Sequence, residues 1–409
     1  MRFLRTASSG RLLAVIAGLV IAIAAGTAIA VAATTGGPKP KPQPLASALH
    51  AAATAPAVTG ITARIRFTNN LIDSSDFTGD SANPILQGAK GRLWLGDNRM
   101  RLELQSDNGD AQVLVNGRSF WVSDPTSNTV YEGTLPADMT GSSKDGAAHA
   151  APTIASIQSE LTRLMARVTV GGASTSNPTN IAGRPAYSVS ISPKHSGGLL
   201  GSLRLAWDAA NGTPLNVAVY ARGNPTPVLA LTATDISYGA VPASDFTITP
   251  PAGDKVVTIS PPAGGNAAAS AHAKHAKHAD VSGVAAVASK VPFTLAAPAS
   301  LVGLPRESTT LLNWGGKPAA MVSYGRNLGG LIIIEQSAPA GASAKASGSS
   351  ADGLALPSVS INGATGTELD TAIGSVVHFT SHGVAYTVIG SVPPYAANQA
   401  ARGLTKSAS

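Results

Sequence analysis

The chain has 409 residues, of which 44% are hydrophobic and 12% charged, enough for two ordinary domains with their own cores. Cysteine is absent, which excludes disulfides, thiolate metal sites, cysteine nucleophiles and a lipidated N-terminal cysteine. The formal net charge is +7, but cations in the predicted tails and linkers account for it. No folded segment carries a basic stripe interleaved with aromatic residues, so a nucleic-acid partner is not expected.

The N-terminal residues 1–35 are predicted to form a membrane anchor or a signal segment. Residues 12–33 are an uninterrupted apolar stretch long enough to cross a bilayer as a helix, and three arginines precede them. Because positive residues stay on the cytoplasmic side, the bulk of the chain is expected outside the cytoplasm, at the cell membrane. Ala28, Ala30 and Ala32 also offer A-x-A cleavage sites, which would give a secreted protein.

A proline-rich spacer and a short helix come next. Residues 36–44 read GGPKPKPQP, and their prolines remove backbone donors and fix φ, so they predict a stiff spacer. The alanine-rich residues 45–55 predict a helix that ends at Pro56.

Period-two patterning begins after this helix. Residues 61–68 and 99–105 alternate apolar with polar side chains, as expected for strands that are wet on one side and belong to an antiparallel sheet. Turn signals at residues 96–98, 107–110 and 116–117 separate the runs at hairpin spacing. Residues 60–132 are therefore predicted to form a β-meander.

A helix and further strands complete the first predicted domain, residues 45–255. Residues 153–168 have helical spacing of Ile154, Ile157, Leu161 and Leu164, and this helix needs a sheet to cover. Strands are predicted at 187–191, 203–207, 215–220 and 228–236, and the segment closes with FTITPPAG at 246–253. About ten strands exceed what a strongly twisted open sheet carries without curling, so a curled or half-closed barrel is expected.

Residues 256–284 are low-complexity and predict a flexible linker to a second, smaller domain at 285–409. Five apolar runs predict strands in it: TLLNW, PAAMVSY, LIIIEQ, VVHFT and AYTVIG. The Ala-, Ser- and Gly-rich residues 338–354 predict a disordered loop, and AANQAARGL near the C-terminus predicts a short helix.

The search for catalytic and metal-binding patterns favours a protein that is not an enzyme and has no cofactor. The sequence has no G-x-S-x-G elbow, H-E-x-x-H pair or phosphate loop. His272, His275 and His278 would gather a metal only if their segment were helical, and a soluble linker that contains histidine is the preferred interpretation. Ser106-Asp107-Asn108 matches a tripeptide of penicillin-binding enzymes. The Ser-x-x-Lys and Lys-Thr-Gly motifs that those enzymes also need are absent from the sequence, so the tripeptide indicates a hairpin turn.

Four motifs occur together and in order: Gly91 to Trp94, Arg99 to Glu103, Asn116 to Pro125, and Phe246 to Gly253. In this combination, residues 45 to 255 resemble the lipoprotein-carrier superfamily typified by LolA. The resemblance implies an unclosed antiparallel β half-barrel with helices packed into its mouth and an apolar cavity that accepts acyl chains. It also implies that Phe120 and Val122 face inward while Trp121 covers the outer surface or an edge.

The smaller second domain makes the architecture similar to that of RseB-like proteins, which bind the outer part of a membrane-embedded anti-sigma factor. The family's carriers latch their helical lid with a strand arginine, and this chain has Asp97-Asn98 near that place, so a latch-driven release cycle is in doubt. The overall prediction is a mainly β (α+β) protein, a half-barrel followed by a smaller strand-rich domain.

The predicted function is extracytoplasmic binding of a lipid or a lipoprotein acyl chain, with about 0.8 kcal/mol contributed by each buried CH₂. The alternative is a regulatory sensor that docks on a membrane-protein partner. No catalytic residue and no metal ligand is predicted. A filled core made by the same side chains is the competing interpretation for each residue of the expected cavity lining: Ile61, Ile65, Phe67, Met100, Leu102, Leu104, Val113, Val115, Leu203, Leu205, Leu229 and Leu231.

Overall fold

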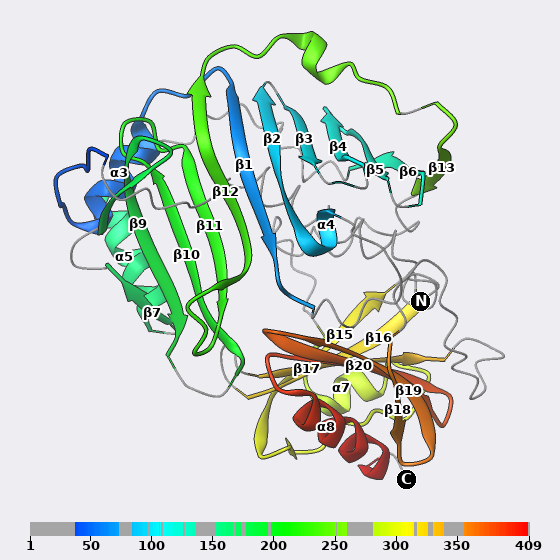
Figure 1. The fold of residues 1–409 in the computed structure, drawn as a ribbon. Coiled ribbons are helices and arrows are strands. Elements are labelled where there is room, and N and C mark those ends of the chain that lie inside the picture. Colours follow the sequence, from blue (N-terminus) through cyan, green and yellow to red (C-terminus); the bar gives the residue numbers. More distant parts are fainter. Residues whose placement is uncertain are drawn as a thin grey trace.

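The computed structural model describes residues 37–72, 84–135, 153–259, 281–338 and 356–407, apart from short stretches at 97, 106, 108, 126, 167, 173–176, 195–197, 251, 315–316 and 326–329. These residues form two sheets, a large curved one and a smaller one that lies beside its lower end in Figure 1. The predicted fold class, mainly β with a half-barrel and a smaller strand-rich domain, is confirmed.

The large sheet contains thirteen strands in the spatial order β13-β6-β5-β4-β3-β2-β1-β12-β11-β10-β9-β7, and β8 pairs with β9. All neighbours are antiparallel except β13 and β6, which run parallel. The strands are β1 Ile61–Asn69, β2 Gly88–Gly96, β3 Arg99–Gln105, β4 Ala111–Asn116, β5 Ser119–Asp124, β6 Thr129–Thr134, β7 Val168–Gly171, β8 Asn177–Ile181, β9 Arg184–Pro193, β10 Leu200–Asp208, β11 Pro214–Ala221, β12 Pro227–Tyr238 and β13 Lys255–Ile259.

The expected count of about ten strands was too low. The additional strands include β7 and β8, which are only four and five residues long, and β13, which lies mostly in the stretch assigned to the linker. The closing segment at 246–253 contains no strand among its described residues. Phe246 ends a short 3-10 helix, η3 Ala243–Phe246, and is buried.

The sheet curls because it is wide and its ladders are irregular. Register shifts occur in β1 at Arg64/Ile65, where it pairs with β12, and in the β10–β11 and β11–β12 pairs. Such bulges bend a strand and increase its twist. We call the face of β1 that carries Ala63, Ile65 and Phe67 the inner face, since all three are buried in the main core, and the opposite face the outer face.

Phe120, Trp121 and Val122, which follow the third hairpin turn, lie as the resemblance implied. Val122 is buried and Phe120 half-buried against the main core, where they pair with Val113 and Val115. Trp121 alternates to the outer face opposite Leu114. The side chains of Phe120 and Trp121 therefore lie on opposite faces of β5.

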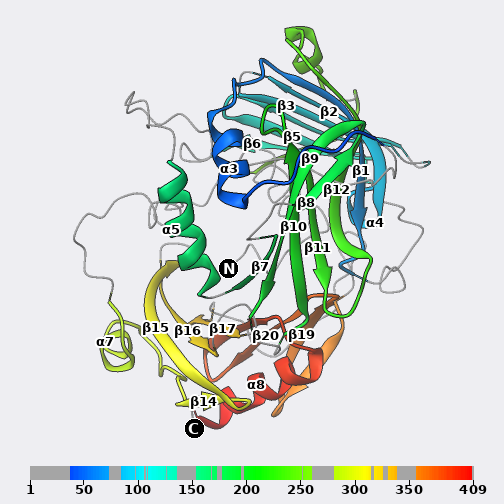
Figure 2. The same cartoon turned by 90° about the vertical axis from the view of Figure 1, so that its left-hand side faces the viewer.

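Within the described residues, three α-helices accompany the large sheet: α3 Leu45–Thr54, α4 Pro84–Gln87 and α5 Ile154–Met165. The predicted alanine-rich helix is confirmed by α3, which buries Leu45, Ala46 and Ala48. Figure 2 shows α3 and α5 on the same side of the β7–β10 part of the sheet. α4 contributes Ile85 and Leu86 to the main core.

The second sheet has eight strands in the order β14-β15-β16-β17-β21-β20-β19-β18. All five predicted strands are present, and β14, β18 and β19 are additional. The strands are β14 Ser300–Leu301, β15 Leu304–Trp314, β16 Lys317–Tyr324, β17 Leu331–Ser337, β18 Ser358–Ile361, β19 Ala364–Thr371, β20 Gly374–Ser381 and β21 Val384–Gly390. The C-terminal helix α8 Pro394–Ser407 covers one face, and α7 Val284–Ala288 packs on β15.

The two sheets meet through a few hydrogen bonds. The backbone N–H of Leu199 donates to the carbonyl oxygen of Ser391, and that of Leu200 donates to Ser391 Oγ, both at 2.8 Å. Ala372 N donates to the carbonyl oxygen of Leu71, also at 2.8 Å. Ser391 Oγ in turn donates to the carbonyl oxygen of Ile373, so one hydroxyl links both domains.

Some expectations fall on parts that the structure does not describe. They are the apolar stretch 12–33, the three linker histidines and most of the predicted loop at 338–354. Among the described residues, no helix has the length and apolar character needed to span a bilayer.

Candidate functional site

The inner face at β1–β5 is a closed hydrophobic core. Eight of the twelve residues expected to line a cavity are buried in it, none more than 7% exposed. They come from β1, β3, β4 and β12 and interlock with Leu93, Val122 and Tyr131. The buried eight are Ile65, Phe67, Met100, Leu102, Leu104, Val113, Val115 and Leu231.

The inner face at β10–β12 is less well covered. Leu203 is 38% exposed, and Leu205 and Leu229 are half-buried. The register places Leu203 opposite Val219 and Val219 opposite Leu229, so these three form one continuous apolar row. A second row runs from Leu205 through Val217 to Leu231. The fourth of the less buried candidates, Ile61, packs on the edge of the main core.

Helix α5 lies beside α3 at the β7 edge of the sheet. Its apolar stripe was expected to cover a sheet, but none of its residues is buried, and Ile154 and Leu164 are 40% and 38% exposed. The helix contacts α3 and the short edge strand β7, where Leu161 packs against the same cluster as Leu205. One turn of the stripe therefore meets the sheet, and the rest stays uncovered.

Helix α3 fills the other part of this inner surface. Leu45 and Ala48 pack against Tyr187 and Trp207, whose ring centroids are 6.2 Å apart. Tyr187 Oη donates to the carbonyl oxygen of Lys41 at 2.8 Å, which fixes the spacer that leads into the helix. Helix α3 thus packs closely on the sheet with buried side chains, whereas α5 has no buried residue.

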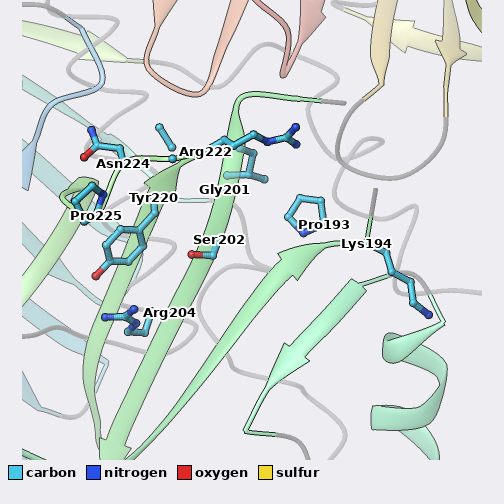
Figure 3. Close-up of a pocket in the computed structure, with 12 residues that line it drawn as sticks. Pro193, Lys194, Gly201, Ser202, Arg204, Tyr220, Arg222, Asn224 and Pro225 are labelled. Atoms are coloured by element: carbon cyan, nitrogen blue, oxygen red, sulfur yellow. The ribbon is translucent and has the colours of Figure 1, made fainter. Parts of the chain in front are cut away.

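A polar cleft of about 620 Å³ opens on the outer face of β10 and β11, and its lining is drawn in Figure 3. The guanidinium of Arg204 lies over the ring of Tyr220, 4.9 Å from its centroid. Arg222 and Lys194 also line the cleft, and Lys194 Nζ donates to the carbonyl oxygen of Met165 at 2.7 Å. The cleft is adjacent to the domain junction, because Leu200 belongs to both.

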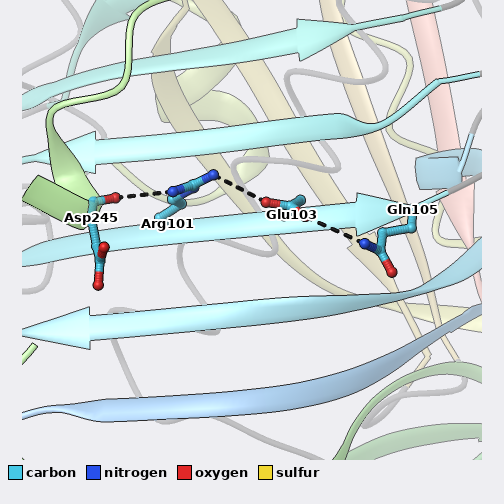
Figure 4. A network of polar contacts seen from close by, with 4 residues as sticks. All are labelled: Arg101, Glu103, Gln105 and Asp245. Atoms are coloured by element: carbon cyan, nitrogen blue, oxygen red, sulfur yellow. Dashed lines mark hydrogen bonds and ion pairs between the residues drawn. The ribbon is translucent and has the colours of Figure 1, made fainter.

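A polar network on the outer face of β3 has a structural explanation. Arg101 pairs with Glu103 at 3.1 Å, donates to the carbonyl oxygen of Asp245 at 3.4 Å and covers the ring of Trp94 at 4.7 Å (Figure 4). Gln105 Nε2 donates to the other oxygen of Glu103 at 3.5 Å. The contact with Asp245 holds the η3 segment on the sheet, so Arg101 has a structural role.

The second domain contains a buried carboxyl group. Glu335 is 0% exposed, and its Oε2 accepts a hydrogen bond from the backbone N–H of Ala296 at 2.8 Å. Burial raises the pKa of Glu335 to about 8. Burial, with the nearby charge of Glu335, raises the pKa of Tyr386 to about 12 and also raises that of Tyr324. Because the carboxyl is sealed from solvent, it is not placed to meet a substrate.

The described residues contain no group of three or more potential metal-ligating side chains of the His, Cys, Asp and Glu types. The hairpin between β3 and β4 includes Asp107, in agreement with the predicted turn. The site that the fold presents is therefore a pair of surfaces on β10–β12, apolar inside and cationic outside.

Comparison with known proteins gives a likeness of architecture. No family model and no curated protein matches the chain. Among solved structures, the Pseudomonas aeruginosa MucA/MucB complex matches at 16% identity and a TM-score of 0.39, covering 87% of this chain and 96% of that one. A complex of MucB with MucA(peri) matches at 16% identity and TM-score 0.38, covering 87% and 94%. An uncharacterized conserved protein from Thermus thermophilus matches at 8% and 0.31, covering 52% and 98%. Every one of these TM-scores is below 0.5, so the matches are a likeness of architecture alone.

Sequence reasoning missed one cluster on the outer face. Arg64 lies directly opposite Arg92, and Arg66 directly opposite Lys90, in the β1–β2 ladder. Neither segment alone contains a basic stripe, because these four cations come together only when β1 pairs with β2. The available signal was a cation at every second position in each of two neighbouring strands.

Proposed function

We propose that this chain is an extracytoplasmic binding protein that holds a lipid or lipoprotein acyl chain along the inner face of β10–β12. The observation that supports the proposal is the incomplete cover of the two apolar rows, in which Leu203 is 38% exposed and Leu205 and Leu229 are half-buried. A filled core explains the inner face at β1–β5, but it does not explain why Leu203, Ile154 and Leu164 remain more than a third exposed. A hydrocarbon chain between helix and sheet would cover all three.

The energetics favour such a ligand. Each methylene transferred from water to this surface contributes about 0.8 kcal/mol, so burying about ten of them gives about 8 kcal/mol, which corresponds to micromolar affinity before ordering costs. The rows run across strands, which suits an elongated ligand better than a compact one. The predicted N-terminal apolar segment would place the domain close to a supply of lipid.

Replacing Leu203 with aspartate is expected to weaken acyl-chain binding at least tenfold, because a carboxylate at the exposed end of the first row would need to be desolvated by the ligand. The change should leave stability nearly intact, since Leu203 is already 38% exposed. The measurement is titration of the full chain with a fluorescent fatty acid, supported by mass spectrometry of lipids that co-purify with it.

Val256→Asp is the matched control, because Val256 is 54% exposed on β13 at the far edge of the sheet. Binding should be unchanged in this variant. Equal binding by Leu203→Asp and the parent chain, or recovery of the parent chain with no lipid and no uptake, would remove the acyl-chain proposal.

A second candidate function, regulatory docking on a membrane protein, is favoured by a separate apolar surface. On the small sheet Ile332 and Ile389 are paired directly across β17 and β21 and are 42% and 38% exposed. Val376 on β20 lies beside Ile389 and is half-buried. Adjacent exposed isoleucines on a sheet face are typical of a protein interface rather than of a free surface.

The double change Ile332→Ser with Ile389→Ser is expected to abolish recovery of a membrane-protein partner with the full chain from native membranes. Serine removes the apolar anchor without changing charge, and such anchors carry most of an interface's free energy. Tyr395→Ser, at a site that is 74% exposed on α8, serves as the control. Recovery of the same proteins by parent and double variant contradicts the docking candidate and leaves the acyl-chain proposal untouched.

A further inference from the structure

The outer face of β1 and β2 carries four cations at adjacent positions of one ladder. Arg64 and Arg66 alternate with the buried residues of β1, and Lys90 and Arg92 do the same on β2. The register pairs Arg64 with Arg92 and Arg66 with Lys90. All four side chains are exposed. We call these four residues the cation ladder.

The cation ladder is unfavourable for the isolated chain. Like charges directly opposite on neighbouring strands destabilise a sheet, and here two such pairs are stacked in succession. No ion pair or side-chain hydrogen bond in the described part of the chain involves any of the four. Of the carboxylates on the flanking strands, Asp235 lies opposite Arg64, and Glu103, opposite Arg92, is already held by Arg101.

The same face continues toward the polar cleft. Thr68, the next outer-face position of β1, pairs with Ala230, which pairs with Ala218, which pairs with Arg204. Arg204 and Arg222 line the cleft, whose described lining contains no carboxylate. The outer face of the half-barrel therefore carries cations at the cation ladder and at the polar cleft. Of the two carboxylates on the flanking strands, Glu103 is paired with Arg101, which leaves Asp235.

We propose that this outer face docks on the anionic phosphate headgroups of a phospholipid bilayer. Clusters of four or more Lys and Arg side chains next to a membrane favour anionic lipids, and each contributes separately to binding. The predicted apolar segment and proline-rich spacer support this choice, because about ten residues of extended spacer keep the domain within about 30 Å of the surface.

Other anionic partners fit this face less well. Trp94 and Tyr220 lie on this face, and arginines cover both rings, so neither ring is free to stack on a base. The exposed large apolar residues of the described chain all lie outside β1 and β2. A protein interface would need such an anchor, whereas a headgroup layer needs only charge.

Site-specific fluorescence on the full chain in nanodiscs tests the proposal. Because the chain has no cysteine, Thr62→Cys on the outer face of β1 gives a unique labelling position. Energy transfer to an acceptor on the lipid headgroups is measured in phosphatidylcholine discs and in discs containing about one-third phosphatidylglycerol. We expect strong transfer only with the anionic lipid and its loss in high salt, where screening shortens to a few ångströms.

The variant Arg66→Gln with Lys90→Gln should lower the docking constant about thirtyfold, roughly fivefold for each charge removed. Its melting temperature should stay the same or rise, since a like-charge pair is relieved. Lys290→Gln with Lys317→Gln removes the same charge from exposed positions of the second domain and should change docking less than twofold.

Three results would overturn the proposal. They are equal transfer in both lipid compositions, equal losses in the two charge variants, and an unchanged signal with discs while short duplex DNA or polyglutamate binds the labelled face. Fatty-acid uptake measured in the same samples separates this outcome from that of the acyl-chain proposal, because the Arg66 and Lys90 variant keeps the inner face intact.

Discussion

Gly91→Ala is expected to lower the free energy of unfolding of the first domain by about 3 kcal/mol, more than any other single change considered for this domain. Gly91 lies in the middle of β2, between Ile65 of β1 and Leu104 of β3. A Cβ there would overlap the carbonyl oxygen of Glu103, which belongs to the backbone and cannot rotate away. Urea unfolding of the full chain followed by tryptophan fluorescence provides the measurement.

Gly96→Ala provides a control in the same strand. A Cβ at Gly96 would find its nearest neighbours, the side chains of Val241 and Phe246, at 3.8 and 3.9 Å, which is ordinary contact. Its effect should stay within about 0.5 kcal/mol. Equal destabilisation by both substitutions would show that Gly91 is not kept for close strand approach.

Glu335→Gln is expected to remove a large pH dependence from the stability of the second domain. Burial raises the pKa of Glu335 to about 8, above its value of 4.5 in the absence of the fold. Between these values the folded chain holds a proton that the unfolded chain has released. The contribution of Glu335 to stability is therefore fully present below about pH 4.5 and is lost as pH rises to about 8, an amount on the order of 5 kcal/mol.

Calorimetry at pH 5 and pH 8.5 measures this dependence. In the parent chain the melting transition of the second domain should fall by many degrees at the higher pH, while glutamine, which never ionises, should hold it constant. Glu307→Gln makes the same chemical change at an exposed position of β15 and should keep the parent's pH dependence. If the melting temperature of the parent's second domain is the same at both pH values, burial does not raise the pKa of Glu335 and the prediction is wrong.

Most of the fold was predictable because the strands are wet on one side. In β1 and β3 the period-two pattern gives the strand, its inner face and its antiparallel pairing together. The missed elements carry too little pattern. β7 has four residues, β14 has two, and β13 begins where the composition already indicates a linker. Their pairing depends on partners that are distant in the sequence.

The candidate site was less predictable, because periodicity identifies a face but not its coverage. Leu102 and Leu203 occupy equivalent positions in their alternating patterns, yet one is 2% exposed and the other 38%. The exposed fractions differ because different elements pack on the two side chains. The sequence pattern does not show which strands α4 and α5 will contact. The cation ladder was missed for a related reason, since Arg66 and Lys90 meet only through the strand register.

The strand order of the large sheet has a consequence for how the proposed acyl chain would reach the inner face. It ends at β13 on one side and at β7 on the other, and within the described residues no ladder joins these two strands. The two edge strands can therefore separate without breaking a backbone pair between them. If the inner face holds the proposed acyl chain, that chain could enter between the edges while its head group stays outside, and the size of the head group would then set no limit on which lipids bind.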